Sequence, residues 1–301
     1  VRNAPNGDSL VIDVARNTLL RFSPDGSLVR RYAPPNESFR PAGVACIGKE
    51  IWITDAVGHC VAAFDADSGK FVRSIGGRGP GPAEFGAPLG MAATPDRLVC
   101  VVDTFNDRVQ VLDATGKWVR DVGRPGNQVG CLGRPKDVAV GPDGVIFVTD
   151  ASSQRVHAFD PTGRALLAFG EPESGVGSLS MPAGICISEV CPLPDVMLPD
   201  GFKAAYYIAV AEQLSNPGIR VYAWRDRKTS GLVSGDAARP SKSADNPHWS
   251  ADKCSACHQQ DRGRSIPIVP AKTDAICLAC HDGKKAREEA HPIGRSATAA
   301  G

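Results

Sequence analysis

Two short peptides near the C-terminal end of the sequence combine cysteine and histidine at a spacing that suits cofactor chemistry. They read CSACH over residues 254–258 and CLACH over residues 277–281. In a CxxCH peptide the two thiols add across the vinyl groups of a haem, and the histidine ligates the iron. The pattern therefore predicts two covalently bound haem c groups. The attachment residues would be Cys254, Cys257, Cys277 and Cys280, and the proximal iron ligands His258 and His281.

The same four cysteines also suit a tetrahedral zinc site, because paired CxxC elements supply four thiolates. Zinc would not require a histidine directly after each pair, whereas haem attachment does. Since both histidines stand at the haem position, haem is favoured over zinc and over a pair of disulfides.

The second axial ligand of a c-type haem iron is usually methionine or histidine. All three methionines, Met91, Met181 and Met197, lie far upstream of the CxxCH peptides. Methionine is therefore disfavoured as a ligand. Because methionine raises the reduction potential of a haem relative to histidine, we expect low potentials.

Two of the six histidines remain as candidates for the distal side of the irons. His59 and His157 belong to repeats upstream, whereas His248 and His291 flank the two CxxCH peptides. The count predicts His248 and His291 as distal ligands and both haems as bis-histidine. Three alternatives stay open: either histidine with either haem, a ligand from a neighbouring molecule, and both histidines as solvated loop residues.

An iron with protein ligands on both faces changes oxidation state but has no position for a substrate. This favours an electron-transfer protein over a haem enzyme. The segment 241–301 has few large apolar residues, so two porphyrins would supply its apolar centre. Short helices are expected at 250–258, 273–281 and 284–291, which gives a mostly α-helical or irregular dihaem domain.

The sequence upstream is organised as a repeat. Asp13, Asp55, Asp103 and Asp150 each end a short β-branched or aromatic run, and they are separated by 42, 48 and 47 residues. Four short strands in a unit of that length predict an all-β propeller. An aspartate at the same point of every unit is expected to accept hydrogen bonds from turn N–H groups rather than to line a channel as an acid.

The fourth unit carries the most distinctive pattern, with PKDVAV at 135–140, GPDG at 141–144, VTD at 148–150 and RVHAFD at 155–160. These runs resemble NHL repeats, and the resemblance covers roughly residues 5–225. It implies a propeller that binds a ligand or partner, with catalysis in some members. NHL propellers commonly have six blades, whereas about five are visible. A hidden blade, a missing N-terminal piece and an incomplete ring remain alternatives.

The expected organisation is an NHL-like propeller over 1–225, a polar linker over 226–246 and a dihaem c-type cytochrome domain over 247–301. The last segment resembles small multihaem cytochromes, some of which stack into extracellular filaments. The expected partners are therefore redox proteins or other copies of the chain. The alternative function is a propeller oxidoreductase that passes substrate electrons to its own haems.

Composition narrows the location and the partners. The chain has 301 residues, a net charge of +1 and no apolar run long enough to span a bilayer. Neither nucleic-acid binding nor a membrane span is expected. Cys46, Cys60, Cys100, Cys131, Cys186 and Cys191 lie outside the haem motifs. Their even number suits up to three disulfides, with Cys186–Cys191 favoured, or else free thiols. An even number of cysteines suits an oxidising compartment, and the resemblance to c-type cytochromes implies haem attachment outside the cytoplasm. Both arguments favour a periplasmic or extracellular protein whose signal peptide has been removed.

Overall fold

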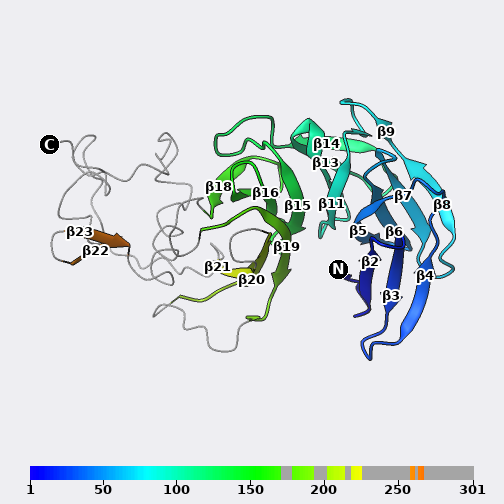
Figure 1. Ribbon diagram of the computed structural model, residues 1–301, viewed down its shortest axis with the longest axis horizontal. Helices are drawn as coiled ribbons and strands as arrows, with labels where there is room; N and C mark the ends of the chain where they lie inside the picture. Colours follow the sequence, from blue (N-terminus) through cyan, green and yellow to red (C-terminus); the bar gives the residue numbers. More distant parts are fainter. Residues whose placement is uncertain (171–177, 193–201, 214–217, 226–257, 262–263, 268–301) are drawn as a thin grey trace. The chain divides into compact units, whose positions relative to one another are not determined.

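The computed structural model describes residues 1–170, 178–192, 202–213, 218–225, 258–261 and 264–267 (Figure 1). Backbone contacts divide the chain into two units. The first comprises Val1–Pro172, Leu179–Ile187 and Val210–Ile219, and the second comprises Glu173–Ser178, Ser188–Ala209 and Arg220–Gly301. The expected domain boundaries at 225 and 246 stay predictions.

Five sheets of three or four strands follow one another in the described residues, and the strands of each of these sheets pair in sequence order. We call these sheets blades one to five. Blade one contains β1 (Arg2–Asn3), β2 (Ser9–Asp13), β3 (Thr18–Phe22) and β4 (Leu28–Tyr32), and blade two contains β5 (Pro41–Ile47), β6 (Glu50–Asp55), β7 (Cys60–Asp65) and β8 (Phe71–Ile75). Blade three contains β11 (Pro88–Ala93), β12 (Val99–Asp103), β13 (Arg108–Leu112) and β14 (Trp118–Val122). Blade four contains β15 (Pro135–Val140), β16 (Ile146–Asp150), β17 (Arg155–Phe159) and β18 (Ala165–Phe169), and blade five contains β19 (Pro182–Ser188), β20 (Tyr206–Glu212) and β21 (Ile219–Trp224).

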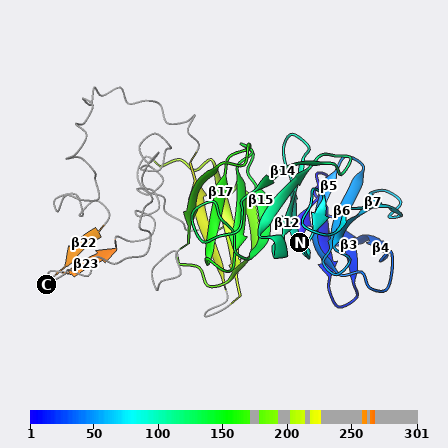
Figure 2. The ribbon, with the colours of Figure 1, turned by 90° about the horizontal axis from the view of Figure 1, so that it is seen from above.

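The predicted propeller is confirmed as a five-bladed, all-β fold in the described residues. The first strand of blade one, β1, is short, and its two residues pair with Leu10 and Ser9. Figure 2 shows neighbouring strands of blades three and four lying side by side. Smaller elements join the blades, namely β9 (Gly77–Arg78), β10 (Glu84–Phe85) and the 3-10 helix η1 (Thr104–Asn106). β9 and β10 pair in parallel, which no strand pattern predicted.

The hydrophobic core lies between adjacent blades. One cluster joins blades one and two around Tyr32 and Phe64, a second joins blades two and three around Trp52 and Met91, and a third joins blades three and four around Phe159. In blades two to five the second strand is the most buried, because it packs on both faces. β12, for example, is buried along its whole length. β-branched residues suit such strands, and VCVVD supplies three of them.

The first strands of blades two and three approach each other backbone to backbone. A Cβ atom at Gly43 would collide with the Leu89 carbonyl oxygen and with the backbone of Gly90. The absence of a side chain is therefore required at Gly43. Thr54 completes this contact, because its Oγ1 lies 2.6 Å from the Leu89 carbonyl oxygen and 2.6 Å from the Gly43 nitrogen.

Blade four departs from its neighbours at the residue equivalent to Gly43 and Gly90, which is Asp137. The Arg2 guanidinium donates to Asp137 Oδ1 at 2.7 Å, and the Ile185 backbone N–H donates to Oδ2 at 3.1 Å. One carboxylate thus connects the first strands of blades one, four and five.

The disulfides expected among the propeller cysteines are wrong, because all six residues are free thiols. Most of them lie in different strands or loops of the blades, as Cys46 in β5 and Cys100 in β12 illustrate. Burial raises the pKa of the Cys100 thiol to about 12, and it also raises the pKa values of Cys46 and Cys60. These three thiols are therefore protonated near neutral pH. No helix among the described residues is long and apolar enough to cross a membrane.

Candidate functional site

The predicted haem site falls almost entirely outside the described residues. Cys254, Cys257, Cys277, Cys280, His281, His248 and His291 all lie there. His258 is the first residue of β22 (His258–Asp261), which pairs with β23 (Arg264–Pro267). The helix expected over 250–258 is therefore wrong at its last residue, because that residue pairs in a hairpin. The site assignments themselves stay predictions.

The recurring aspartates act as turn acceptors, as the sequence predicted. Asp55 Oδ1 accepts from the backbone N–H groups of Arg40, Val57 and Gly58, at 2.9 to 3.2 Å. Asp150 accepts hydrogen bonds from backbone N–H groups in the same way. Asp55 and Asp150 thus each join a turn of their own blade to the loop that enters the blade. In blade five Glu212 takes the place of the aspartate, and its Oε1 accepts a hydrogen bond from the Ser180 N–H at 2.8 Å. The sequence analysis missed Glu212 because it followed a recurring aspartate.

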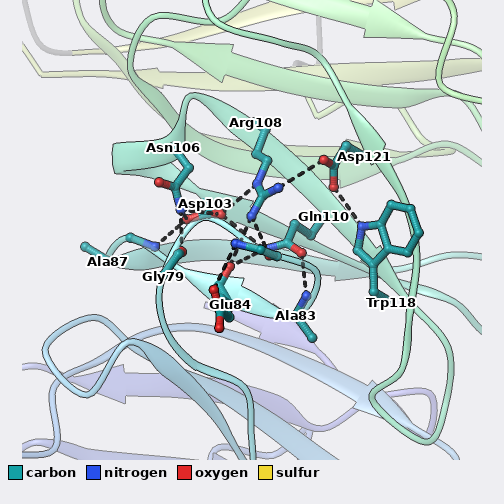
Figure 3. A network of polar contacts seen from close by, with 12 residues as sticks. Gly79, Ala83, Glu84, Ala87, Asp103, Asn106, Arg108, Gln110, Trp118 and Asp121 are labelled. Carbon is teal, nitrogen blue, oxygen red and sulfur yellow. Dashed lines mark hydrogen bonds and ion pairs between the residues drawn. The ribbon is translucent and has the colours of Figure 1, made fainter.

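Blade three builds the most extensive polar network on this turn (Figure 3). Asp103 is fully buried and accepts from Arg108 Nε at 2.9 Å and from Gln110 Nε2 at 3.1 Å. Asn106 Nδ2 donates to the same carboxylate. Gln110 also holds the loop between β9 and β10, since its Nε2 donates to the Glu84 carbonyl and its Oε1 accepts from the Ala83 N–H.

The guanidinium nitrogens Nε, Nη1 and Nη2 of Arg108 all donate hydrogen bonds within this network. Besides Asp103, it donates through Nη1 to Asp121 at 3.0 Å and through Nη2 to the carbonyls of Gly81 and Glu84. A guanidinium so paired is not free to bind a substrate anion. The network therefore fastens a loop to the blade.

An open cavity of about 410 Å³ lies beside this network. Phe105, Asp107 and Arg124 contribute to its lining. Phe105 is 73% exposed. The pKa of the Asp107 carboxyl is raised by burial and by the neighbouring carboxylates of Asp150 and Asp103.

Blade four brings a serine, a histidine and an aspartate together, which the sequence analysis did not anticipate. Ser153 Oγ lies 3.0 Å from His157 Nε2 and 3.0 Å from Asp150 Oδ2, whereas His157 Nε2 and Asp150 Oδ2 are 3.9 Å apart. His157 is 1% exposed, and its Nδ1 has no hydrogen-bond partner in the structure.

The order of these groups argues against nucleophilic catalysis. In a hydrolase triad the imidazole lies between the serine and the carboxylate. Here the serine lies between the other two, so its single proton is directed to Asp150 when His157 Nε2–H donates to Ser153 Oγ. Burial lowers the pKa of His157 to about 4, with a smaller contribution from Arg155 and an opposing one from Asp150. His157 is thus a neutral structural residue at pH 7.

The two propeller histidines are engaged within the blades, as the ligand elimination assumed. His59 Nδ1 accepts the Ala87 N–H at 3.0 Å, and His157 contacts Ser153. Met91 is fully buried in the core between blades two and three. In the described part of the chain, no group of three histidine, cysteine, aspartate or glutamate side chains is arranged to hold a metal ion.

Comparison with protein families finds two matches. An NHL repeat matches residues 132–159, and a doubled CXXCH motif matches residues 248–286. The first confirms the NHL character of blade four. The second indicates covalently bound c-type haem and, with it, electron transfer. No curated protein matches the chain.

Solved structures share the propeller. A streptogramin B lyase structure aligns with a TM-score of 0.51 at 16% identity, over 75% of this chain and 68% of that one. A nidogen/laminin complex aligns with a TM-score of 0.52 at 16% identity, over 70% and 69%. One is an enzyme and the other a complex between proteins. At this identity the likeness shows the fold alone.

Proposed function

We propose that this protein transfers electrons through two haem c groups that are covalently bound near its C-terminus, with the propeller as scaffold and partner-docking module. The observation that carries the proposal is the pair of complete CxxCH peptides inside the doubled CXXCH match at 248–286. A bound haem supplies one-electron chemistry. The chain supplies the thioether bonds and the axial imidazoles that hold the iron.

In this proposal His258 and His281 are the proximal ligands and His248 and His291 the distal ones. The family match begins at His248 itself, which supports a role for that residue within the motif. His291 lies beyond the match and rests on the elimination of methionines and propeller histidines. Covalent haem attachment also supports an exported location, in the periplasm or outside the cell.

Two double variants test the haem count. Cys254→Ala with Cys257→Ala and Cys277→Ala with Cys280→Ala should each lose one of two haems, measured as haem per protein by pyridine haemochrome absorbance. Cys46→Ala, in the propeller, is the matched control and should keep both. A purified holoprotein without a Soret band and a sharp reduced α-band would refute the proposal, and retained zinc would then identify the metal.

Two single variants test the distal ligands. His248→Met and His291→Met should each introduce the methionine–iron charge-transfer band of an oxidised cytochrome and raise the potential of one haem. His59→Met, in blade two, should do neither. Unchanged spectra and potentials in both variants would show that these histidines do not ligate iron.

The alternative proposal is a propeller oxidoreductase that passes substrate electrons to its own haems. It differs from an electron carrier in requiring an organic substrate to reduce the haems. Reduction of the haems by small redox mediators, without any organic substrate, is the expected behaviour.

A further inference from the structure

Blades three and four are equivalent residue by residue, which makes their differences informative. Asp103 and Asp150 are 47 positions apart, and each pairs with the first residue of the preceding inner strand, Pro88 and Pro135. Gln110 pairs with Asp121 as His157 pairs with Ala168. The entering loops agree too, because the parallel pair Arg78–Phe85 corresponds to the parallel bridge Pro125–Leu132.

The formal charge of the Asp-turn end reverses between these two blades. We use Asp-turn end for the end of each blade that contains its recurring aspartate. In blade three this end carries Arg78 and Arg108 against Glu84, Asp103, Asp107 and Asp121, two cations to four carboxylates. In blade four it carries Arg124, Arg134, Lys136 and Arg155 against Asp137 and Asp150, four cations to two carboxylates.

The two carboxylates of blade four are already committed. Asp137 pairs with Arg2 and also accepts backbone N–H groups. Asp150 is fully buried and accepts from backbone N–H groups and Ser153. In the described residues, neither carboxylate forms an ion pair with the side chain of a blade-four cation.

The cations lie around Asp150. Pro135 and Arg155 are the strand partners of Asp150 on its two sides, and Arg134 and Lys136 flank Pro135. Arg124 is in the same entering loop, since its carbonyl accepts the Leu132 N–H at 2.8 Å. We call Arg124, Arg134, Lys136 and Arg155 the blade-four cationic patch.

Two observations show that Arg155 and Lys136 lack anionic partners in the described residues. Arg155 Nε is buried and has no hydrogen-bond partner, whereas the equivalent Arg108 Nε donates to Asp103. The pKa of Lys136 is lowered by burial and by the neighbouring Arg134, so two like charges lie close together. Arg124 and Arg134 are exposed to solvent.

We propose that the blade-four cationic patch is the docking surface for an acidic protein partner. The inference rests on the proposed electron-transfer function, because a redox partner must bind transiently and in a fixed orientation. Unpaired cations at the edge of a surface raise association rates with a carboxylate-rich partner and orient it. Arg124 and Arg134 are exposed beside the glycine-rich loop 123–133, and Lys136 and Arg155 are partly exposed.

The experiment measures binding to fluorescein-labelled poly-L-glutamate, which presents carboxylates as an acidic protein does, by fluorescence anisotropy on the full-length holoprotein. The triple variant Arg124→Gln, Arg134→Gln, Lys136→Gln should bind about tenfold more weakly at low ionic strength, and the difference should shrink in 0.5 M salt. The matched control is Lys49→Gln, Lys70→Gln, Lys117→Gln at the opposite ends of blades two and three, which should change the affinity less than about twofold.

A second variant restores the blade-three pattern. Ala168→Asp places a carboxylate where blade three has Asp121, so it should pair with Arg155 and weaken binding by about threefold. Because Ala168 is on an outer strand and partly exposed, folding should survive.

Three outcomes would overturn the docking surface: equal loss in the control triple variant, no loss in the patch variants, or tighter binding of duplex DNA than of poly-L-glutamate. Stopped-flow reduction of the haems by reduced flavodoxin, an acidic one-electron donor, separates this inference from the proposed function. Slower reduction in the patch variant, with unchanged reduction by an uncharged mediator, supports both. Haems that no donor reduces would refute electron transfer while the anisotropy result still decides the surface.

Discussion

Acid destabilisation through His157 is the most quantitative consequence of the structure. The imidazole is buried, and burial lowers its pKa from 6.5 to about 4. Because the folded pKa lies below the unfolded one, the unfolded chain binds the proton more tightly. The stabilisation from keeping His157 neutral is therefore complete above pH 6.5 and is lost as the pH falls from 6.5 towards 4.

The magnitude follows from the gap between the two pKa values. Each pKa unit corresponds to about 1.4 kcal/mol, so the full effect is roughly 3 kcal/mol, of which about 2 kcal/mol falls between pH 7 and pH 4.5. His157→Gln removes the titration and introduces the residue that blade three has at Gln110. The variant should therefore lose about 2 kcal/mol less stability than the native protein over this interval.

The assay is guanidinium chloride unfolding followed by circular dichroism at several pH values between 7 and 4.5. Ser153→Ala is the control, because it removes the partner of His157 Nε2 but keeps the titrating imidazole. It should lower stability at every pH and leave the pH dependence in place. If His157→Gln retains the pH dependence of the native protein, other groups cause the acid lability and the reasoning is refuted.

Three further changes test the contacts that hold the blades. Gly43→Ala should destabilise the fold by about 1–3 kcal/mol in urea unfolding, because the new Cβ meets the Leu89 carbonyl, whereas Gly77→Ala, with open space around it, should cost less. Thr54→Val should cost about 1–2 kcal/mol by thermal or urea unfolding, because the hydroxyl bonds at Gly43 and Leu89 are lost. Asp103→Ala should cost about 3–5 kcal/mol by the same measurement, since it removes the buried acceptor that Arg108, Gln110 and Asn106 share, and a loss under 1 kcal/mol would contradict the network.

Local patterns in the sequence predicted the blades well, because each strand and turn is specified by residues close to one another. The β-branched runs ending at Asp55, Asp103 and Asp150 become the buried second strands, and the aspartates bind turn N–H groups. Blade five shows where the aspartate pattern fails as a predictor. Glu212 has a longer side chain than aspartate and does the same work from a blade whose turns differ.

The contacts of individual side chains were not predictable from the strand pattern, even within one turn. Nothing near Ser153 or His157 in the sequence indicates that the strand turn brings both to Asp150. The expected cysteine pairing was wrong for a related reason, since the parity of cysteines says nothing about distance in space. The haem ligands stay predictions: His258 and His281 rest on the CxxCH spacing, and His248 and His291 rest on the count of methionines and histidines.

The ion pair between Arg2 and Asp137 has a consequence for how the propeller forms. Most contacts between blades join neighbours in the chain, such as Thr54 and Leu89, which are 35 residues apart, whereas Arg2 and Asp137 are 135 apart. The entropic cost of closing a loop increases with the length of the loop. Neighbouring blades can therefore assemble one after another before Arg2 and Asp137 come into contact. Blade one therefore joins blade four late in folding and separates from it early in unfolding. The Arg2–Asp137 contact therefore belongs to the last step of folding, in which blades that have already formed assemble into the propeller.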